Sequence, residues 1–100
     1  FLRGQMLPGL SMSRSLGDTQ AHSVGVLAEP SIQASVEFPQ GNSLIIASDG
    51  VWERVTAEEA ASIAQHEGAD PEAAAINLVV QARSRWLQEG GDIDDITAVV

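Results

Sequence analysis

The chain has 100 residues with 14 acidic and 5 basic side chains, so its net charge at neutral pH is −9. This charge argues against nucleic acid or an anionic membrane as a partner, because both attract basic surfaces. The chain has no cysteine, which excludes disulfides and thiolate metal sites. No apolar run approaches the roughly 20 residues of a membrane helix, and a hydrophobic content of 44% predicts one globular domain with a modest core.

The ends of the sequence lead us to expect a piece of a longer protein. The chain begins at Phe1 rather than Met, and Val100 falls inside an apolar run. The start has no pattern of a secretory signal, and we expect an intracellular location, in the cytoplasm or the nucleus. The turn formers Gly4 and Pro8 predict irregular structure over residues 1–9.

Residues 10–25 give only weak signals. Arg14 and Asp18 are four residues apart, so one helical turn would let them pair, and on spacing alone a structural ion pair or a turn is the better interpretation. The small polar residues 19–25 predict a loop. His22 stands alone in this loop and is expected to be solvated.

Two strands joined by a turn are predicted next. Apolar and polar residues alternate over 32–38, which is typical of a strand with one buried and one wet face. Residues 44–47 are a continuous apolar run, which is typical of a strand buried on both faces. Because residues 39–42 have turn chemistry, the two runs predict an antiparallel hairpin.

The run 44–47 stops at Asp49 and Gly50, which places a carboxylate where the chain leaves a core strand. An ionised carboxylate in a region of low dielectric constant needs a partner or a cation. Gly50 permits a close approach of the backbone or a positive φ. Asp49 is therefore a candidate metal ligand, although an Asp-Gly pair taken alone is more often a simple turn.

Two helices follow, with clear signals at their ends. Thr56 with Glu59 three residues later forms a capping box. Asp70 and Pro71 suit the N-cap and the first position of the second helix, and Gly90 suits its end. Trp86 is expected to be a core anchor. The expected inward faces are Ala60, Ile63 and Ala64 in the first helix, and Ile76, Val79, Val80, Arg83 and Leu87 in the second, with Ala75, Ala82 and Trp86 alongside.

Acidic residues crowd the start of the last predicted strand. Asp94 and Asp95 precede the β-prone run 96–100. If this strand runs antiparallel to residues 44–47, its start lies at the same edge of the sheet as Asp49. Carboxylates that converge there repel one another unless one is protonated or a cation lies among them. Ligands that are all oxygen suit Mg²⁺ or Mn²⁺ rather than structural zinc.

Four short motifs occur in order along the chain. Each motif alone is weak evidence for a protein family, but the four in this order are specific. They are an SRxxGD stretch within residues 10–18, Glu29-Pro30 before a predicted strand, an ASDGxWE strand end within residues 45–53, and DDIT at residues 94–97. With two predicted helices between the last pair, this order resembles the PP2C (PPM) family of metal-dependent Ser/Thr protein phosphatases. The resemblance covers nearly the whole chain and only the C-terminal half of that family's catalytic domain.

The resemblance implies an α+β fold, as a fragment of an α/β/β/α sandwich in which antiparallel β-sheets are flanked by helices. Residues 1–100 would form the incomplete C-terminal part of a single domain. The implied activity is hydrolysis of phosphoserine or phosphothreonine in a phosphoprotein by a metal-activated water at a two-metal Mg²⁺ or Mn²⁺ centre. At the matching positions, Asp49 and Asp94 are the implied metal ligands, and the chain has no residue to which a catalytic role is assigned.

The sequence also departs from this family pattern. Asp95 stands where the family usually has Asn, and the added charge would alter metal affinity or hydrogen bonding around the ligands. The family's N-terminal Asp-Gly metal motif and its phosphate-binding arginine have no counterpart here. We therefore expect weak metal binding and negligible turnover from this chain alone, and phosphatase activity from its full-length parent.

Two other interpretations stay open beside the phosphatase. The first is a non-catalytic PP2C-like regulatory or binding domain that keeps the fold. The second is a plain acidic α+β interaction domain, which is disfavoured because Asp49 follows a core strand. As a fragment of the sandwich, the chain would expose apolar surface where the rest of the domain belongs, and we expect copies of the chain to associate through it.

Overall fold

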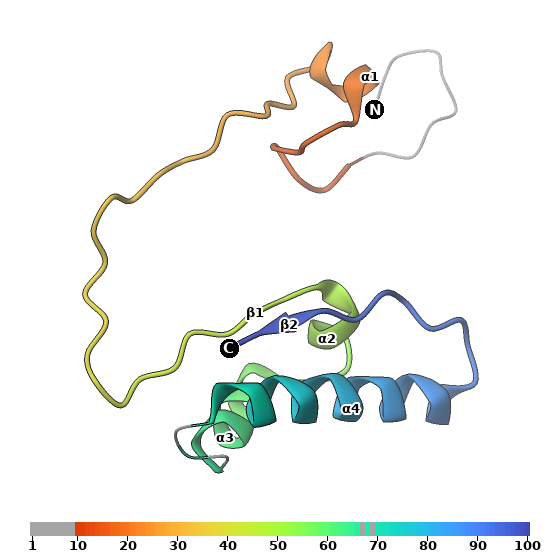
Figure 1. The fold of residues 1–100 in the computed structure, drawn as a ribbon. Coiled ribbons are helices and arrows are strands. Elements are labelled where there is room, and N and C mark those ends of the chain that lie inside the picture. The colour runs from red at the N-terminus through yellow and green to blue at the C-terminus, as the bar shows by residue number, and fades with distance from the viewer. Residues whose placement is uncertain (1–9, 67, 69) are drawn as a thin grey trace. The chain divides into compact units, whose positions relative to one another are not determined.

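The computed structural model describes residues 10–66, 68 and 70–100, so the irregular structure predicted for 1–9 lies outside the described residues. The chain divides into two compact units, with the boundary between Glu37 and Phe38. Helices and a two-stranded antiparallel sheet give it an α+β fold (Figure 1). The elements in order are α1 Thr19–His22, β1 Ile46–Ala47, α2 Asp49–Trp52, α3 Ala57–His66, α4 Pro71–Glu89 and β2 Ala98–Val99.

The first unit is held by a β-bridge between two chain segments. Arg14 and Leu27 form a parallel bridge, in which the Leu27 amide donates to the carbonyl of Ser13 at 3.0 Å and the Ser15 amide donates to the carbonyl of Leu27 at 2.9 Å. The Arg14 guanidinium donates from Nη1 to Ser31 Oγ at 2.6 Å, rather than pairing with Asp18. Arg14 therefore makes its hydrogen bond to another residue of the first unit.

The loop predicted for residues 19–25 is partly wrong, because α1 occupies Thr19–His22. Gly17 and Asp18 both have positive φ, 84° and 49°, and they turn the chain into this helix. His22 Nε2 lies 2.6 Å from the Gly17 carbonyl oxygen and closes the turn. A four-residue helix is too short to show an apolar period in the sequence, so the pattern gave no signal for it.

The hairpin predicted from residues 32–38 and 44–47 is wrong. Residues 30–38 form neither helix nor strand, and Ile32 and Val36 are 82% and 68% exposed. Alternation predicts a strand only where a partner strand and a covering layer bury its apolar side. Within the described residues, no such layer covers these side chains.

The sheet pairs β1 with β2 in an antiparallel ladder, which is the condition under which the sequence analysis placed Asp49 and the start of the last strand at one edge. Ile46 lies opposite Val99 and Ala47 opposite Ala98. The strands are shorter than the predicted runs. Residues 44–47 were expected to be buried on both faces, and only one face is buried. Ile45 and Ala47 pack on the core, whereas Leu44 and Ile46 are each 61% exposed.

Both predicted helices are confirmed, with their capping signals. The Thr56 amide donates to Glu59 Oε2 at 2.9 Å, and the Glu59 amide donates to Thr56 Oγ1 at 3.2 Å, which completes the capping box. Asp70 Oδ1 accepts from the amides of residues 72 and 73 at the start of α4, and Gly90 ends that helix with φ 72°. Within the described ranges, none of the helices combines the length and hydropathy that a membrane span requires.

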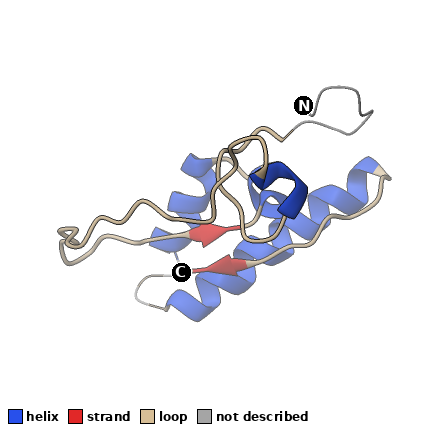
Figure 2. Ribbon diagram, turned by 90° about the horizontal axis from the view of Figure 1, so that it is seen from above, coloured by secondary structure: helices blue, strands red, loops and turns tan. Residues whose placement is uncertain are grey.

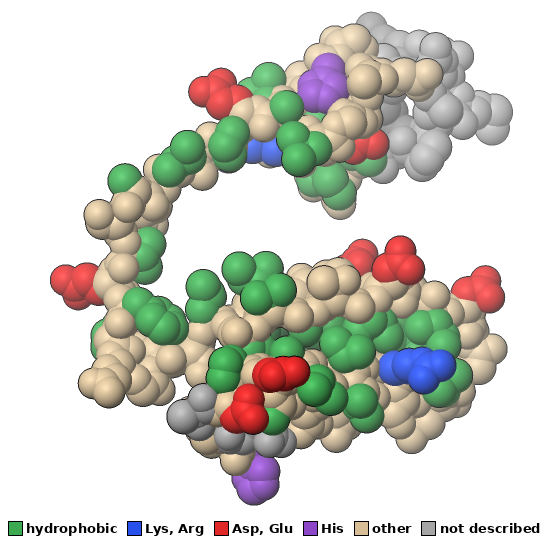
Figure 3. Space-filling model, in the orientation of Figure 1, with side chains coloured by type: hydrophobic (Ala, Val, Ile, Leu, Met, Phe, Trp, Pro, Cys, Tyr) green, Lys and Arg blue, Asp and Glu red, His purple; other side chains and the backbone are tan. Residues whose placement is uncertain are grey.

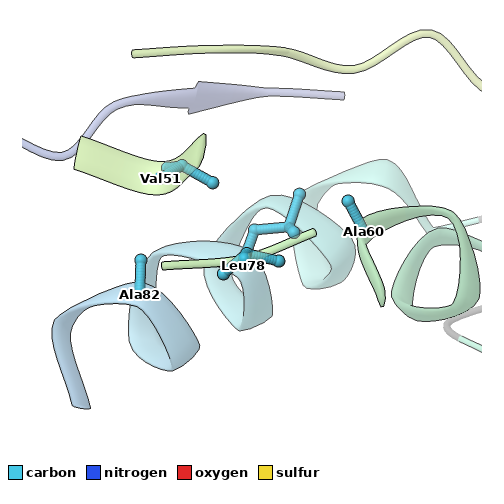
Figure 4. Packing of buried hydrophobic residues seen from close by; sticks show 5 residues of the cluster. Val51, Ala60, Leu78 and Ala82 are labelled. Atoms are coloured by element: carbon cyan, nitrogen blue, oxygen red, sulfur yellow. The ribbon is translucent and has the colours of Figure 1, made fainter. Parts of the chain in front are cut away.

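The core lies between the sheet and the helices, with the two strands side by side over α4 (Figures 1 and 2). Leu78 and Val51 are its largest fully buried side chains (Figure 4). Val51, Val55, Ala60, Leu78 and Ala82 form its buried centre, and Ile45, Ala47, Ile63, Ile96, Ala98 and Val100 pack against them.

The predicted inward face of α4 is wrong for most of its large residues. The buried side chains are Ala74, Leu78, Ala82 and Trp86. The small side chains at positions 74 and 82 let the helix approach α2, α3 and the sheet closely, and this close approach decides which side of α4 is covered. Trp86 is confirmed as a core anchor.

A bidentate ion pair links α3 to α4. Arg85 Nη1 and Nη2 donate to Glu59 Oε2 and Oε1, each at 2.8 Å, and Arg85 Nη1 also donates to the carbonyl of Arg54 at 2.6 Å. The hydrogen bonds from Arg85 and from the Thr56 amide lower the pKa of Glu59 from 4.5 to about 2. Because this pKa is depressed in the folded protein, the pair stabilises the fold above pH 4.5 and ceases to do so as the pH falls through about 2.

This linkage predicts the pH dependence of the Glu59→Gln variant. In urea titrations of the full-length protein, we expect its loss of stability relative to wild type to be largest above pH 4.5 and to shrink between pH 4.5 and about 2. Glu58→Gln, which removes the charge of an exposed neighbour in the same helical turn, is the control for the loss of one acidic side chain from α3. A Glu59→Gln difference that is constant from pH 6 to pH 2 would contradict the assignment.

Candidate functional site

Asp49 lies where the sequence places it, at the point where the chain leaves β1. Ser48 is extended, with φ −73° and ψ 166°, and α2 begins at Asp49 directly after it. The Asp49 side chain is exposed at this end of the strand. Asp49-Gly50 can therefore be both a simple turn and part of a metal site, because the turn itself exposes the Asp49 carboxylate.

Ser48 joins the end of β1 to the start of β2. Its amide donates to the Thr97 carbonyl at 3.0 Å, and its Oγ accepts from the Thr97 amide at 3.0 Å. The Ser48 hydroxyl donates in turn to the Asp95 carbonyl at 3.0 Å. The segment that carries Asp94 and Asp95 is thus fixed against the residue before Asp49, a role that the sequence analysis missed.

Gly50 allows the segment before β2 to pass directly over the turn. A Cβ at position 50 would lie 2.9 Å from the carbonyl carbon of Asp95 and against its oxygen, and 3.3 Å from the Ile96 side chain. The two backbones can approach this closely only because position 50 has no side chain. The close approach expected of Gly50 is confirmed, and its partner is the segment at Asp95.

Two tryptophans donate hydrogen bonds to the backbone of this turn. Trp86 Nε1 on α4 donates to the Gly50 carbonyl at 2.7 Å, and Trp52 Nε1 donates to the Ala47 carbonyl at 3.0 Å. The Arg54 guanidinium lies 3.7 Å from the centroid of the Trp86 ring and pairs with Glu89 at 2.9 Å. A buried indole N–H usually forms a hydrogen bond. Because the Trp86 indole on α4 donates to the Gly50 carbonyl, it fixes the position of Asp49-Gly50 relative to α4.

Asp94 lies before β2, at the end of the sheet where β1 finishes. The ladder continues from Ala47 opposite Ala98 to Ser48 opposite Thr97, and this order brings Asp49 and Asp94 to one edge. Asp94 is exposed, and its Oδ1 accepts from the Asp95 amide at 2.8 Å. The antiparallel arrangement predicted for this edge is therefore observed, while the assignment of both carboxylates to one ion stays a prediction.

The chemistry of this edge suits a divalent cation but does not complete a site. Asp49, Asp94 and Asp95 offer oxygen ligands of the kind that Mg²⁺ and Mn²⁺ prefer. The two described salt bridges involve Glu59 and Glu89, so neither neutralises these aspartates. In the part of the chain that the structure describes, no three acidic or histidine side chains are grouped closely enough to hold a metal. A complete centre would need further ligands from outside these residues.

Comparisons with known proteins agree with the motifs. The family model for protein phosphatase 2C matches residues 2–89, a range that includes Asp49 and ends before Asp94. Probable protein phosphatase 2C 61 of Arabidopsis thaliana is 38% identical over 95 residues, which cover 92% of this chain and 28% of that protein. Probable protein phosphatase 2C 72 of the same plant is 32% identical over 101 residues, covering 99% of this chain and 30% of that protein.

A third relative, probable protein phosphatase 2C 76 of Arabidopsis thaliana, is 41% identical over 91 residues, covering 91% of this chain and 20% of that protein. The chain thus spans between 20% and 30% of the length of these relatives. No solved structure matches it. Because the family model covers most of the sequence and agrees with its ordered motifs, the chain belongs to the protein phosphatase 2C family.

Proposed function

We propose that the full-length protein is a Mg²⁺- or Mn²⁺-dependent serine/threonine protein phosphatase, and that residues 1–100 form the C-terminal part of its single catalytic domain. The observation that carries this proposal is the family match over residues 2–89. The antiparallel pairing of β1 and β2, which puts Asp49 and Asp94 at one edge of the sheet, supports it independently of the match.

Charge explains why a phosphatase built on this chain would need cations. A phosphorylated substrate is repelled by a chain with a net charge of −9, unless bound cations reverse the local field. Divalent ions held by carboxylates would neutralise the phosphate and lower the pKa of water. The role of this chain is to hold Asp49 and Asp94 rigidly at one edge, through Ser48, Gly50 and Trp86.

The open face of the sheet supports a complete domain with a second β-layer. Leu44, Ile46 and Val99 are each about 60% exposed on the side of the sheet opposite to the core. A sheet with apolar residues on both faces is completed by packing another layer against the open one. We propose that the rest of the parent domain covers this face in the α/β/β/α sandwich, and that copies of the isolated chain associate through it.

Assaying the full-length protein on phosphoserine and phosphothreonine peptides tests this proposal. We expect hydrolysis that requires Mn²⁺ or Mg²⁺, stops with a chelator and returns when the metal is added back. The 100-residue chain alone should show negligible turnover, because its two carboxylates cannot complete a two-metal centre. Full-length protein that folds and binds phosphopeptide without hydrolysing it would instead support the non-catalytic PP2C-like domain. Hydrolysis that is indifferent to chelation would contradict the metal dependence.

A further inference from the structure

The turn that presents Asp49 lies among like charges. Asp94 reaches the same edge of the sheet, and Asp95 follows it directly. Figure 3 shows acidic side chains over the segment that leads into β2. Carboxylates gathered at one edge repel one another unless a cation lies among them. The contacts that hold the turn in place therefore determine how well this edge is formed before any ion binds.

One of these contacts comes from α4, through the indole of Trp86. Its Nε1 donates to the Gly50 carbonyl at 2.7 Å, and the side chain is only 8% exposed. Gly50 shares a peptide bond with Asp49, so the hydrogen bond fixes the backbone next to the carboxylate. Such a bond is stronger inside the protein than in water, because the local dielectric constant is lower. The direction of the indole N–H thus sets the position of the turn.

Arg54 holds the indole in this direction. Its guanidinium carbon lies over the Trp86 ring, 3.7 Å from the centroid, and its Nη2 pairs with Glu89 Oε2 at 2.9 Å. Its Nη1 also donates to the Glu53 carbonyl at 3.1 Å. The guanidinium is therefore fixed on the ring by one partner on α4 and one directly after α2. A cation over an indole polarises the ring, which makes the N–H a better donor to the Gly50 carbonyl.

The orientation of Arg54 favours contact with the ring over complete hydrogen bonding. Its Nε is buried and has no hydrogen-bond partner among the residues that the structure describes. A buried donor left unpaired is costly, so the stacked position must offer a compensating gain. The backbone of Arg54 is fixed as well, because its carbonyl accepts from Arg85 Nη1 at 2.6 Å. All of these contacts join residues of the second compact unit, so they do not depend on the first.

We propose that Arg54 is a positioning residue for the turn that presents Asp49, and that it acts on this turn through the Trp86 indole. A turn that is already ordered loses less conformational freedom when an ion binds, which raises the affinity for the ion. The expected effect on metal binding rests on the proposed function, whereas the effect on the turn itself does not.

Calorimetric titration of the full-length protein with Mn²⁺ tests the effect on metal binding. Arg54→Gln removes the cation from the ring and is expected to weaken Mn²⁺ binding by about 3- to 10-fold. Arg54→Lys keeps a cation that can lie over the ring, so it should weaken binding by no more than about twofold. Arg83→Gln is the matched control, because it removes the same charge from an exposed position three residues before Trp86. It should leave Mn²⁺ binding within about twofold of wild type.

A double-mutant cycle separates action through Trp86 from a general loss of stability. Trp86→Phe keeps an aromatic ring but has no N–H for the Gly50 carbonyl, and it should weaken Mn²⁺ binding by about 10-fold. Adding Arg54→Gln to Trp86→Phe should weaken binding by less than about twofold more, because the hydrogen bond through which Arg54 acts is already absent. Losses that multiply in the double variant would show that the two residues act independently, and they would overturn the proposal.

The Trp86 indole N–H gives a second readout, which needs no metal. Its signal in a ¹H–¹⁵N spectrum of the full-length protein is identified by its loss in Trp86→Phe. We expect this N–H to exchange with deuterium about 3- to 10-fold faster in Arg54→Gln than in wild type or Arg83→Gln. Glu89→Gln, which removes an exposed partner of Arg54, should raise the rate by about twofold.

Exchange that is unchanged in Arg54→Gln would overturn the proposal, as would unchanged Mn²⁺ binding by a variant of a protein that binds Mn²⁺. Circular dichroism checks that each variant is folded. If Arg54→Gln does not fold, the exchange rate in Glu89→Gln decides in its place, and a rate equal to that of wild type would contradict the role of Arg54. If wild type itself binds no Mn²⁺, the proposed function fails, and the exchange rates still show whether Arg54 holds the turn.

Discussion

In the full-length protein, Asp49→Asn is expected to lower kcat by about 100-fold or more in the phosphopeptide assay, and Asp94→Asn to do the same. Even residues that only support metal ligands cost about 10- to 100-fold when they are replaced, so removal of a ligand should cost at least as much. Asparagine keeps the shape of aspartate and removes its charge. The loss would therefore come from the metal site rather than from packing, because both side chains are exposed.

The control for these two variants is Glu58→Gln, which removes one exposed negative charge from α3 without touching the edge of the sheet. It should leave kcat within about twofold of wild type, as expected for a surface substitution away from the site. Thermal unfolding should be similar in all three variants. Full activity in both aspartate variants would remove the ligand assignment, whatever the family membership.

The second large effect is expected from Gly50→Ala. Position 50 lies in α2, where alanine would by propensity alone stabilise the helix by up to about 1 kcal/mol. The added Cβ instead meets the Asp95 carbonyl, so the strand start must move. We expect the free energy of unfolding to fall by about 1–3 kcal/mol in urea titrations of the full-length protein.

Gly91→Ala is the matched control, because a Cβ there meets no atom within 4 Å and Gly91 has no positive φ. Its stability should be unchanged or slightly increased. Gly50→Ala should also weaken Mn²⁺ binding, because the carbonyl that it displaces holds the segment carrying Asp94 through Ser48. If Gly50→Ala is as stable as wild type and binds Mn²⁺ equally well, the close approach is not what positions this edge.

The sequence predicted best those features that depend on neighbouring residues. Thr56 with Glu59, and Asp70 before Pro71, satisfy helix ends through contacts within four residues, so their signals are local and both helices were predicted. The antiparallel pairing of β1 with β2 was considered only as a condition, because the sequence analysis paired residues 44–47 with residues 32–38, and the structure shows the β1–β2 pairing.

Features that depend on packing between residues far apart in the sequence could not be predicted from local patterns. On α4, the apolar residues Ile76, Val80 and Leu87 have the helical period, as do the residues on the buried face. The face of α4 that packs against the sheet is the one with the small residues Ala74 and Ala82, because they let the helix lie close to the sheet. This packing involves residues far apart in the sequence, so local patterns do not predict it. The strand prediction for residues 32–38 was wrong for the same reason. An alternating pattern forms a strand only where a partner strand pairs with it and another layer buries its apolar side.

The sequence predicts Asp49 and Asp94 as ligands, which stays a prediction, and it did not indicate the residues that hold their segments in place. Asp49 begins α2 just beyond the end of β1, and Asp94 lies in the segment that leads into β2. The hydroxyl of Ser48 and the indole of Trp86 act across 47 and 36 residues of sequence, through hydrogen bonds that no spacing rule anticipates. The one available signal for Ser48 was its place directly before Asp-Gly at the end of an apolar run.

The central claim is that Asp49 and Asp94 hold one divalent centre at the shared edge of β1 and β2. Anomalous diffraction from crystals of the full-length protein soaked in Mn²⁺ tests it most directly. We predict a manganese peak with carboxylate oxygens of both aspartates within about 2–2.5 Å of the metal cluster. A manganese peak that neither aspartate touches, or the two carboxylates at opposite ends of the sheet, would contradict it.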